Sequence, residues 1–177
     1  MELRSDYIRH QELLHILSLL TEPNRLACEI SLYTGLRIGD VLALKADKVK
    51  EKFTIREEKT GKRRVVRLTR DLLDRCHREA GRVWVFEGRL DPYAHRTRQA
   101  VYRDIKRAAA AYRLPGRLQV SPHSCRKVYA VRAIQQGASL ARVRQLLNHS
   151  DEAVTMLYAM ADRLTARKMG WKDGEQG

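Results

Sequence analysis

The alternation of apolar and polar positions along the chain predicts a mostly helical protein. Apolar residues recur at helical spacing in several segments, and Ser, Thr or Gly stands where many of these segments begin or end. Pro23 lies in the opening turn of the second segment, and Gly35 directly follows its last turn. The predicted helices cover residues 10–20, 21–34, 37–45, 70–81, 98–112, 123–137, 139–149 and 151–161.

Two short segments of strand character predict a β-hairpin. Residues 53–58 and 63–68 flank the sequence KTGK, whose glycine suits a turn. Residues 82–88, with the sequence RVWVFEG, predict a third strand beside the hairpin. The expected fold class is α+β, a mostly helical domain with a small three-stranded antiparallel sheet. We expect one domain over residues 1–177, ending in a tail from about residue 163 to 177.

Basic residues outnumber acidic residues and gather in two stretches, residues 59–70 and 89–117. The chain has 35 Lys and Arg against 21 Asp and Glu, which gives a formal net charge of +14. Residues 59–70 contain bases and no acid, whereas a solvated helical face would mix the two signs. The pattern favours contact with a phosphate backbone over a merely basic surface. The residues expected to make such contacts are Lys62, Arg63, Arg64, Arg96 and Arg98.

Several classes of protein are disfavoured by features that the sequence lacks. No apolar run approaches the roughly 20 residues of a membrane span, and residues 1–10 lack the apolar core of a signal peptide. We therefore expect a cytoplasmic protein, associated with the nucleoid if its source is a prokaryote or a phage. Cys28, Cys76 and Cys125 are odd in number and lack zinc-ligand spacing, so we interpret them as small core residues. We expect no metal and no cofactor.

The sequence HSCR places two hydrogen-bonding side chains one helical turn apart. His123 and Arg126 are three residues apart and can share one helix face, where they could bind a small anion. Metal-free cleavage of a phosphodiester requires such cations, because negative charge spreads over the non-bridging oxygens in the transition state. It also requires a nucleophile and an acid for the departing oxygen. The sequence shows no obvious carboxylate cluster for Mg²⁺, which disfavours a two-metal nuclease.

Four motifs together resemble the tyrosine recombinases, or phage-type integrases. They are YTGLRIGDVLAL, HSCR, LLNHS and MLYAM, and they occur in the order and at the separations found in that family's catalytic domain. The resemblance implies that Arg37 and Arg126 clamp the scissile phosphate and that His123 and His149 hydrogen-bond it. It further implies that Lys59 is the general acid and Tyr158 the nucleophile.

The resemblance also implies an activity and partners. The activity is site-specific recombination of double-stranded DNA through a 3′-phosphotyrosyl intermediate, without metal or ATP. The expected assembly is a homotetramer on paired DNA sites, with a monomer in free solution and accessory DNA-binding proteins as further expectations. The sequence departs from the family pattern at Asn148, where a glycine is usual, and at Cys125, where a larger apolar residue is usual. Family members commonly carry a separate N-terminal core-binding domain. We expect none within residues 1–177, so the chain is either a fragment of a longer recombinase or a compact member of the family.

Alternatives remain open for individual residues and for the whole protein. Arg37 could pair only with Asp40, which we interpret as a buttress of the first arginine motif, and Lys62 competes with Lys59 as the acid. Tyr158 could be a core aromatic. Local sequence does not exclude the other tyrosines, which are Tyr7, Tyr33, Tyr93, Tyr102, Tyr112 and Tyr129. The alternative functions are a regulatory or excision factor on a recombinase scaffold, a type IB topoisomerase or telomere resolvase, and an RNA-binding protein.

Overall fold

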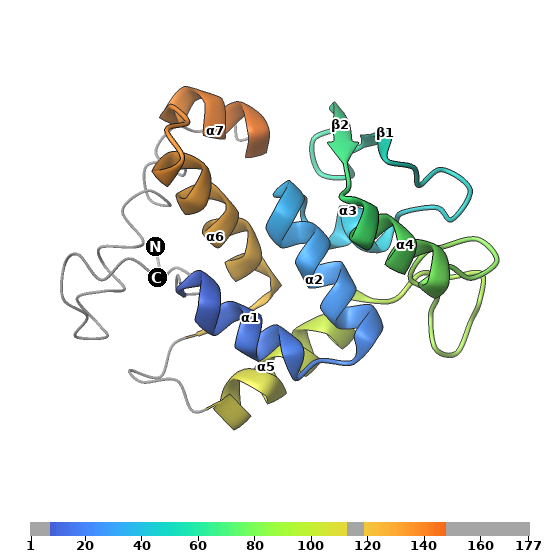
Figure 1. The fold of residues 1–177 in the computed structure, drawn as a ribbon. Helices are drawn as coiled ribbons and strands as arrows, with labels where there is room; N and C mark the ends of the chain where they lie inside the picture. The colour runs from blue at the N-terminus through green and yellow to red at the C-terminus, as the bar shows by residue number, and fades with distance from the viewer. Residues whose placement is uncertain (1–7, 113–118, 148–177) are drawn as a thin grey trace.

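Seven helices and one β-hairpin form the part of the chain that the computed structural model describes, residues 8–112 and 119–147 (Figure 1). The helices are α1 (His10–Ser18), α2 (Glu22–Thr34), α3 (Ile38–Leu42), α4 (Arg70–Glu79), α5 (Arg98–Tyr112), α6 (Pro122–Gln135) and α7 (Leu140–Leu147). The strands are β1 (Lys52–Arg56) and β2 (Arg63–Arg67). The mostly helical α+β prediction is confirmed. The predicted helix over residues 151–161 and the tail over residues 163–177 lie outside the described residues.

The helices begin and end at the residues that favour such ends. The hydroxyl of Thr69 accepts a hydrogen bond from the backbone of Leu72 at the start of α4, and Ser139 does the same for Arg142 at α7. Gly35 ends α2 in the left-handed conformation with φ 70°, which a residue with a side chain adopts at a cost. This glycine stop separates α2 from α3 and lets the chain turn sharply between them.

The predicted third strand is wrong, because the sheet of the described residues has only β1 and β2. These two strands are antiparallel, with Ile55 opposite Arg64. Residues 82–88 instead form isolated bridges that pair Lys45 with Trp84 and Glu87 with His95. The backbone of this segment bonds to the chain that leaves α3, since Val85 N donates to Leu44 O at 2.9 Å. That pairing directs Val85 and Phe86 into the core rather than along the hairpin edge.

Helix α2 is the centre of the core. It packs against α6, α3, α4 and α1, and Figure 1 shows its C-terminal end between α6 and α7 on one side and the hairpin on the other. The three cysteines are buried, as the sequence predicted. Within the described ranges, no helix is long and apolar enough to cross a bilayer.

Candidate active site

The junction between α2 and α3 gathers arginine side chains from distant parts of the chain. Arg64 on β2 donates from Nη2 to the carbonyl oxygen of Thr34, and Arg126 on α6 donates from Nη1 to that of Gly35. The last carbonyls of a helix lack partners within the helix and carry its negative dipole end, so they attract cations. Two guanidinium groups therefore lie at adjacent carbonyls, two or three residues before Arg37.

Arg126 is deeply buried, whereas His123 lies at the surface. Only 1% of Arg126 is exposed, and its Nη2 also donates to the carbonyl oxygen of Leu147 at 2.9 Å. This side chain thus links the ends of α2 and α7. His123 stands one turn earlier, in the first turn of α6, where Ser121 caps the helix. The two residues of the HSCR motif consequently have different environments, one structural and covered and the other accessible to solvent.

Arg37 forms an ion pair with a carboxylate that the sequence motifs did not single out. It is the N-cap of α3, and its Nη1 lies 2.7 Å from Oε2 of Glu57. The Glu57 side chain is 0% exposed and that of Arg37 is 24% exposed. Arg64 Nη1 lies 3.4 Å from the other Glu57 oxygen. Among the ion pairs of the described residues, Arg37 pairs with Glu57 and not with Asp40, so the alternative of an Arg37–Asp40 pair is wrong.

Asp40 on α3 supports the hairpin turn. Its Oδ1 accepts a hydrogen bond from the backbone nitrogen of Glu58 at 2.9 Å. Burial raises the pKa of the Asp40 carboxyl, and the negative charge of Glu57 adds to this rise. The positive charges of Arg37 and Arg126 both lower the same pKa. Arg126 donates to the carbonyl oxygen of Gly35, two residues before Arg37, so the two candidate clamp residues meet at the junction of α2 and α3.

The turn between β1 and β2 presents Lys59 to solvent. Gly61 closes the turn with φ 64°, and its nitrogen donates to the Glu57 carbonyl oxygen at 2.8 Å. On the return strand, the Lys62 carbonyl oxygen accepts from Glu57 N at 3.0 Å. Lys59 and Lys62 are both exposed. The choice between these two lysines as the general acid therefore stays open.

The residues predicted to contact a phosphate backbone separate into distinct environments. Lys62 and Arg63 are exposed, and Arg98 is exposed at the start of α5, with its side chain packed over Gly39. Arg64 is different, since its side chain is only 12% exposed and is bound to Glu57 and Thr34. Arg96 is half-buried and donates to Asn24 Oδ1 at 3.3 Å, in a pocket of about 840 Å³ that also contains Arg103 and Arg107.

Glu57 is the functional candidate that sequence reasoning missed, although a signal for it exists. Phe53 and Ile55 are the half-buried positions of β1, and the next position in this two-residue alternation is Glu57. Val66 and Arg64 likewise share the inward face of β2. A charged residue in phase with inward-facing apolar residues must have a partner, because an unpaired buried charge is very costly. Alternation alone could have identified Glu57 and Arg64 as a buried pair.

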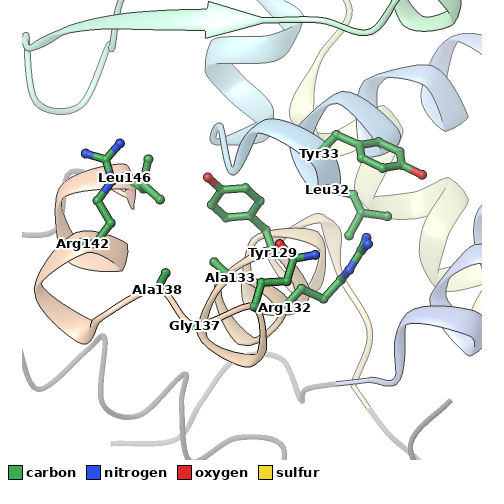
Figure 2. A pocket seen from close by; sticks show the side chains of 10 residues that line it. Leu32, Tyr33, Tyr129, Arg132, Ala133, Gly137, Ala138, Arg142 and Leu146 are labelled. Atoms are coloured by element: carbon green, nitrogen blue, oxygen red, sulfur yellow. The ribbon is translucent and has the colours of Figure 1, made fainter.

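A separate pocket of about 590 Å³ lies between the end of α2, α6 and α7 (Figure 2). Its lining includes Tyr33 of α2 and Tyr129 of α6, two of the competing tyrosines, and Figure 2 shows their rings rising from neighbouring helices. None of the predicted catalytic residues that the structure describes lines this pocket. The Tyr129 ring instead packs against Gly35, whose carbonyl oxygen accepts from Arg126, so this pocket adjoins the junction of α2 and α3.

His149 and Tyr158 lie outside the described residues. Among residues 8–112 and 119–147, no group of three or more His, Cys, Asp or Glu side chains is arranged to hold a metal ion.

Most of the chain matches one known protein family. Residues 6–164 match the model of the phage integrase family. The chain belongs to the phage integrase family. This integrase-family chain is 33% identical over 153 residues to the tyrosine recombinase XerD of Bradyrhizobium diazoefficiens, covering 76% of the chain and 48% of that protein. It is 30% identical over 137 residues to the tyrosine recombinase XerD of Brucella suis, covering 71% of the chain and 44% of that protein. The chain thus spans about half the length of these curated relatives.

Solved structures have the same fold. A λ integrase dimer bound to a COC′ core site superposes with a TM-score of 0.71 at 22% identity, over 100% of this integrase-family chain and 62% of that chain. The catalytic domain of bacteriophage HP1 integrase gives a TM-score of 0.64 at 20% identity, over 98% and 99% of the two chains. The fold is therefore that of a tyrosine recombinase catalytic domain.

Proposed function

We propose that this integrase-family chain is the catalytic domain of a site-specific recombinase that cleaves and rejoins double-stranded DNA. The observation that carries the proposal is the meeting of Arg37 and Arg126 at the junction of α2 and α3, where Arg37 is bound to Glu57 at the base of the hairpin turn that contains Lys59. Two planar multi-donor cations next to an exposed ammonium suit a phosphodiester whose non-bridging oxygens gain negative charge. Family membership supports the assignment of the remaining groups, His123, His149 and Tyr158.

The proposed reaction exchanges one phosphodiester for another. The Tyr158 oxygen attacks the scissile phosphorus, and the phenolic proton passes to a basic group such as His123 or His149. The bond from phosphorus to the 5′ oxygen breaks, and Lys59 gives that oxygen its proton. The products are a 3′-phosphotyrosyl bond and a free 5′ hydroxyl. A 5′ hydroxyl of another strand then attacks the phosphotyrosyl bond, so bond energy is conserved and the reaction needs no ATP.

The cationic site also has to activate the nucleophile. An unperturbed tyrosine has a pKa of about 10, so little phenolate exists at neutral pH without help. Positive charge from Arg37 and Arg126 would stabilise the phenolate as well as the phosphate. Removing either arginine should therefore slow the chemical step more than it weakens DNA binding.

The proposed partners are DNA and further copies of the chain. Solved relatives include the XerH recombinase bound to its palindromic difH substrate after cleavage and a λ integrase tetramer bound to a Holliday junction. By analogy, we assign this chain double-stranded DNA as substrate and a homotetramer on paired sites as the active assembly. Accessory DNA-binding proteins, and action in the cytoplasm at the nucleoid, belong to the same proposal.

Covalent capture of DNA tests this function. The protein is incubated with nicked duplexes that carry a randomised core, and strands that stay attached to protein in denaturant are recovered. The expected result is covalent DNA with the wild type and none with Tyr158→Phe, while both proteins bind duplex DNA equally. An undiminished adduct from Tyr158→Phe, or none from the wild type, would defeat the proposal.

A second assay separates recombination from the alternative functions. Supercoiled plasmid and paired copies of the captured site are offered to the wild type. Exchange of arms between the paired sites supports a recombinase. Relaxation of plasmid without exchange supports a topoisomerase. Binding of duplex DNA with no adduct in the capture assay supports a regulatory factor.

A further inference from the structure

Glu57 connects the first arginine motif to the turn that carries Lys59. Arg37 Nη1 donates to Glu57 Oε2 at 2.7 Å, and the hydroxyl of Thr60 donates to the same oxygen at 3.0 Å. Arg64 Nη1 lies 3.4 Å from Oε1. Arg37 is the N-cap of α3, Thr60 directly follows Lys59, and Arg64 belongs to β2. One carboxylate thus joins three separate segments of the site.

The main chain of Glu57 closes the same turn that its side chain binds. Its carbonyl oxygen accepts from Gly61 N at 2.8 Å, and its nitrogen donates to Lys62 O at 3.0 Å. The next nitrogen, that of Glu58, donates to Asp40 on α3. The turn around Lys59 is therefore held at its base by hydrogen bonds to two acidic residues. The Lys59 side chain is the exposed part of an anchored turn.

The burial of Glu57 demands a reason. Moving a carboxylate out of water costs several kcal/mol, and nearby opposite charge offsets that cost only when the geometry is good. Here the side chain is 0% exposed and both oxygens face donors inside the protein, so Glu57 is arranged to hold other groups rather than to contact DNA. Arg37 carries five N–H donors, and a bond through Nη1 leaves other donors directed elsewhere.

We propose that Glu57 is a positioning residue for strand cleavage. It fixes the Lys59 turn relative to the Arg37 guanidinium, so that the Lys59 ammonium reaches the 5′ oxygen of the phosphate that Arg37 holds. The inference rests on the proposed function. In that reaction the Lys59 proton goes to the 5′ oxygen as its bond to phosphorus breaks, and displacement of a reacting group by about 1 Å can lower a rate about 100-fold.

A change of leaving group tests this role. Once the wild-type cleavage site is mapped, two duplexes are compared, one natural and one with sulfur in place of the 5′ bridging oxygen. A thiolate leaves without a proton, since thiol pKa values are near 8.5, so the sulfur substrate does not need the Lys59 acid. We expect Glu57→Gln to slow single-turnover cleavage of the natural duplex about 10- to 100-fold. The loss of cleavage rate caused by Glu57→Gln should be several-fold smaller on the sulfur duplex, and the affinity of the variant for DNA should stay unchanged.

Matched variants keep the test decisive. Glu58→Gln removes the same charge from the exposed neighbouring residue, and it should cleave both duplexes as the wild type does. Thr60→Val removes the hydroxyl that donates to Glu57 and accepts from Lys62 N at 3.3 Å, and it leaves the ion pairs intact, so it carries the test if Glu57→Gln does not fold. Thr60→Val should slow cleavage of the natural duplex less than Glu57→Gln does, and this loss of rate should likewise shrink on the sulfur duplex. An equal loss on both duplexes, or wild-type rates for both Glu57→Gln and Thr60→Val, would overturn the positioning role. Absence of any adduct with the wild type would instead count against the proposed function.

Discussion

Arg126 donates a hydrogen bond to the carbonyl oxygen of Gly35, the residue that ends α2. The same guanidinium donates to the carbonyl oxygen of Leu147 at the end of α7, and only 1% of Arg126 is exposed. A catalytic candidate is therefore also a structural link between two helix ends. Hydrogen bonds to two carbonyl groups hold the guanidinium in this position, whether or not a phosphate is nearby.

Arg126→Lys should lower both stability and cleavage. A lysine ammonium is a compact point charge and cannot reproduce the planar fork that serves two separate carbonyls. Leaving a buried carbonyl without its donor costs about 1–3 kcal/mol, and urea denaturation should detect a loss of this size. Arg142→Lys on the exposed face of α7 is the control and should change stability by less than about 0.5 kcal/mol. Equal unfolding midpoints for the two variants would contradict the structural role.

Gly35→Ala should be more destabilising than Gly137→Ala. Both glycines have positive φ, at 70° and 90°, so both substitutions incur a similar backbone cost of about 1–2 kcal/mol. A Cβ at Gly35 would also lie 2.5 Å from Cδ1 of Tyr129, whereas one at Gly137 would meet nothing within 4 Å. The additional loss of stability caused by Gly35→Ala should be smaller when it is combined with Tyr129→Ala. A strictly additive double mutant would show that the ring contact does not matter.

Asp40→Asn should change the pH dependence of stability in a defined direction. Burial raises the pKa of Asp40 above its ordinary value of 3.8, so the folded protein binds this proton more tightly than the unfolded chain does. The wild type therefore loses stability from this group as pH rises from 3.8 through the raised pKa. The asparagine variant keeps an acceptor for Glu58 N and lacks this titration. The free energy of unfolding of Asp40→Asn, relative to that of the wild type, should therefore rise with pH over that interval. Urea titrations at several pH values measure this difference, and a difference that stays constant with pH would exclude the effect.

Arg63→Ala and Arg64→Ala should differ although the residues are adjacent. Arg63 is exposed on β2, so its loss should reduce the slope of log affinity for DNA against log salt by about 1. Arg64 is bound to Glu57 and Thr34 inside the protein, and its loss should appear chiefly as lower stability. Fluorescence anisotropy over a salt series, together with urea denaturation, distinguishes the two outcomes. Similar salt slopes for the two variants would contradict this separation.

The helices could be predicted from sequence because their signals are local. Each of these signals acts over a few neighbouring residues. Examples are the Thr69 cap, the Gly35 stop and the spacing of apolar residues. The third strand failed for a tertiary reason, since Val83 and Val85 found backbone partners beside α3 instead of at the hairpin. Strand propensity reports a tendency to pair and not the identity of the partner.

The candidate site divides in the same way between local and long-range information. Motifs named Arg37 and Arg126, but the carboxylate that pairs with Arg37 comes from 20 residues further along the chain. The prediction that Arg64 contacts DNA treated a basic run as one surface, whereas strand alternation turns Arg64 inward and Arg63 outward. Charge composition indicates the sign of the charge on the binding partner. The alternation of side chains along the strand determines which of them can reach that partner.

The most direct test of the central claim is to identify the residue that becomes attached to DNA. Covalent complexes captured from the nicked duplexes are digested, and the peptide that carries the nucleotide is sequenced by mass spectrometry. The account predicts a single modified peptide with the nucleotide on Tyr158, and loss of that peptide in Arg37→Ala and Arg126→Ala variants that still bind DNA. A nucleotide on Tyr33, Tyr129 or any other residue, or undiminished modification without the two arginines, would contradict it.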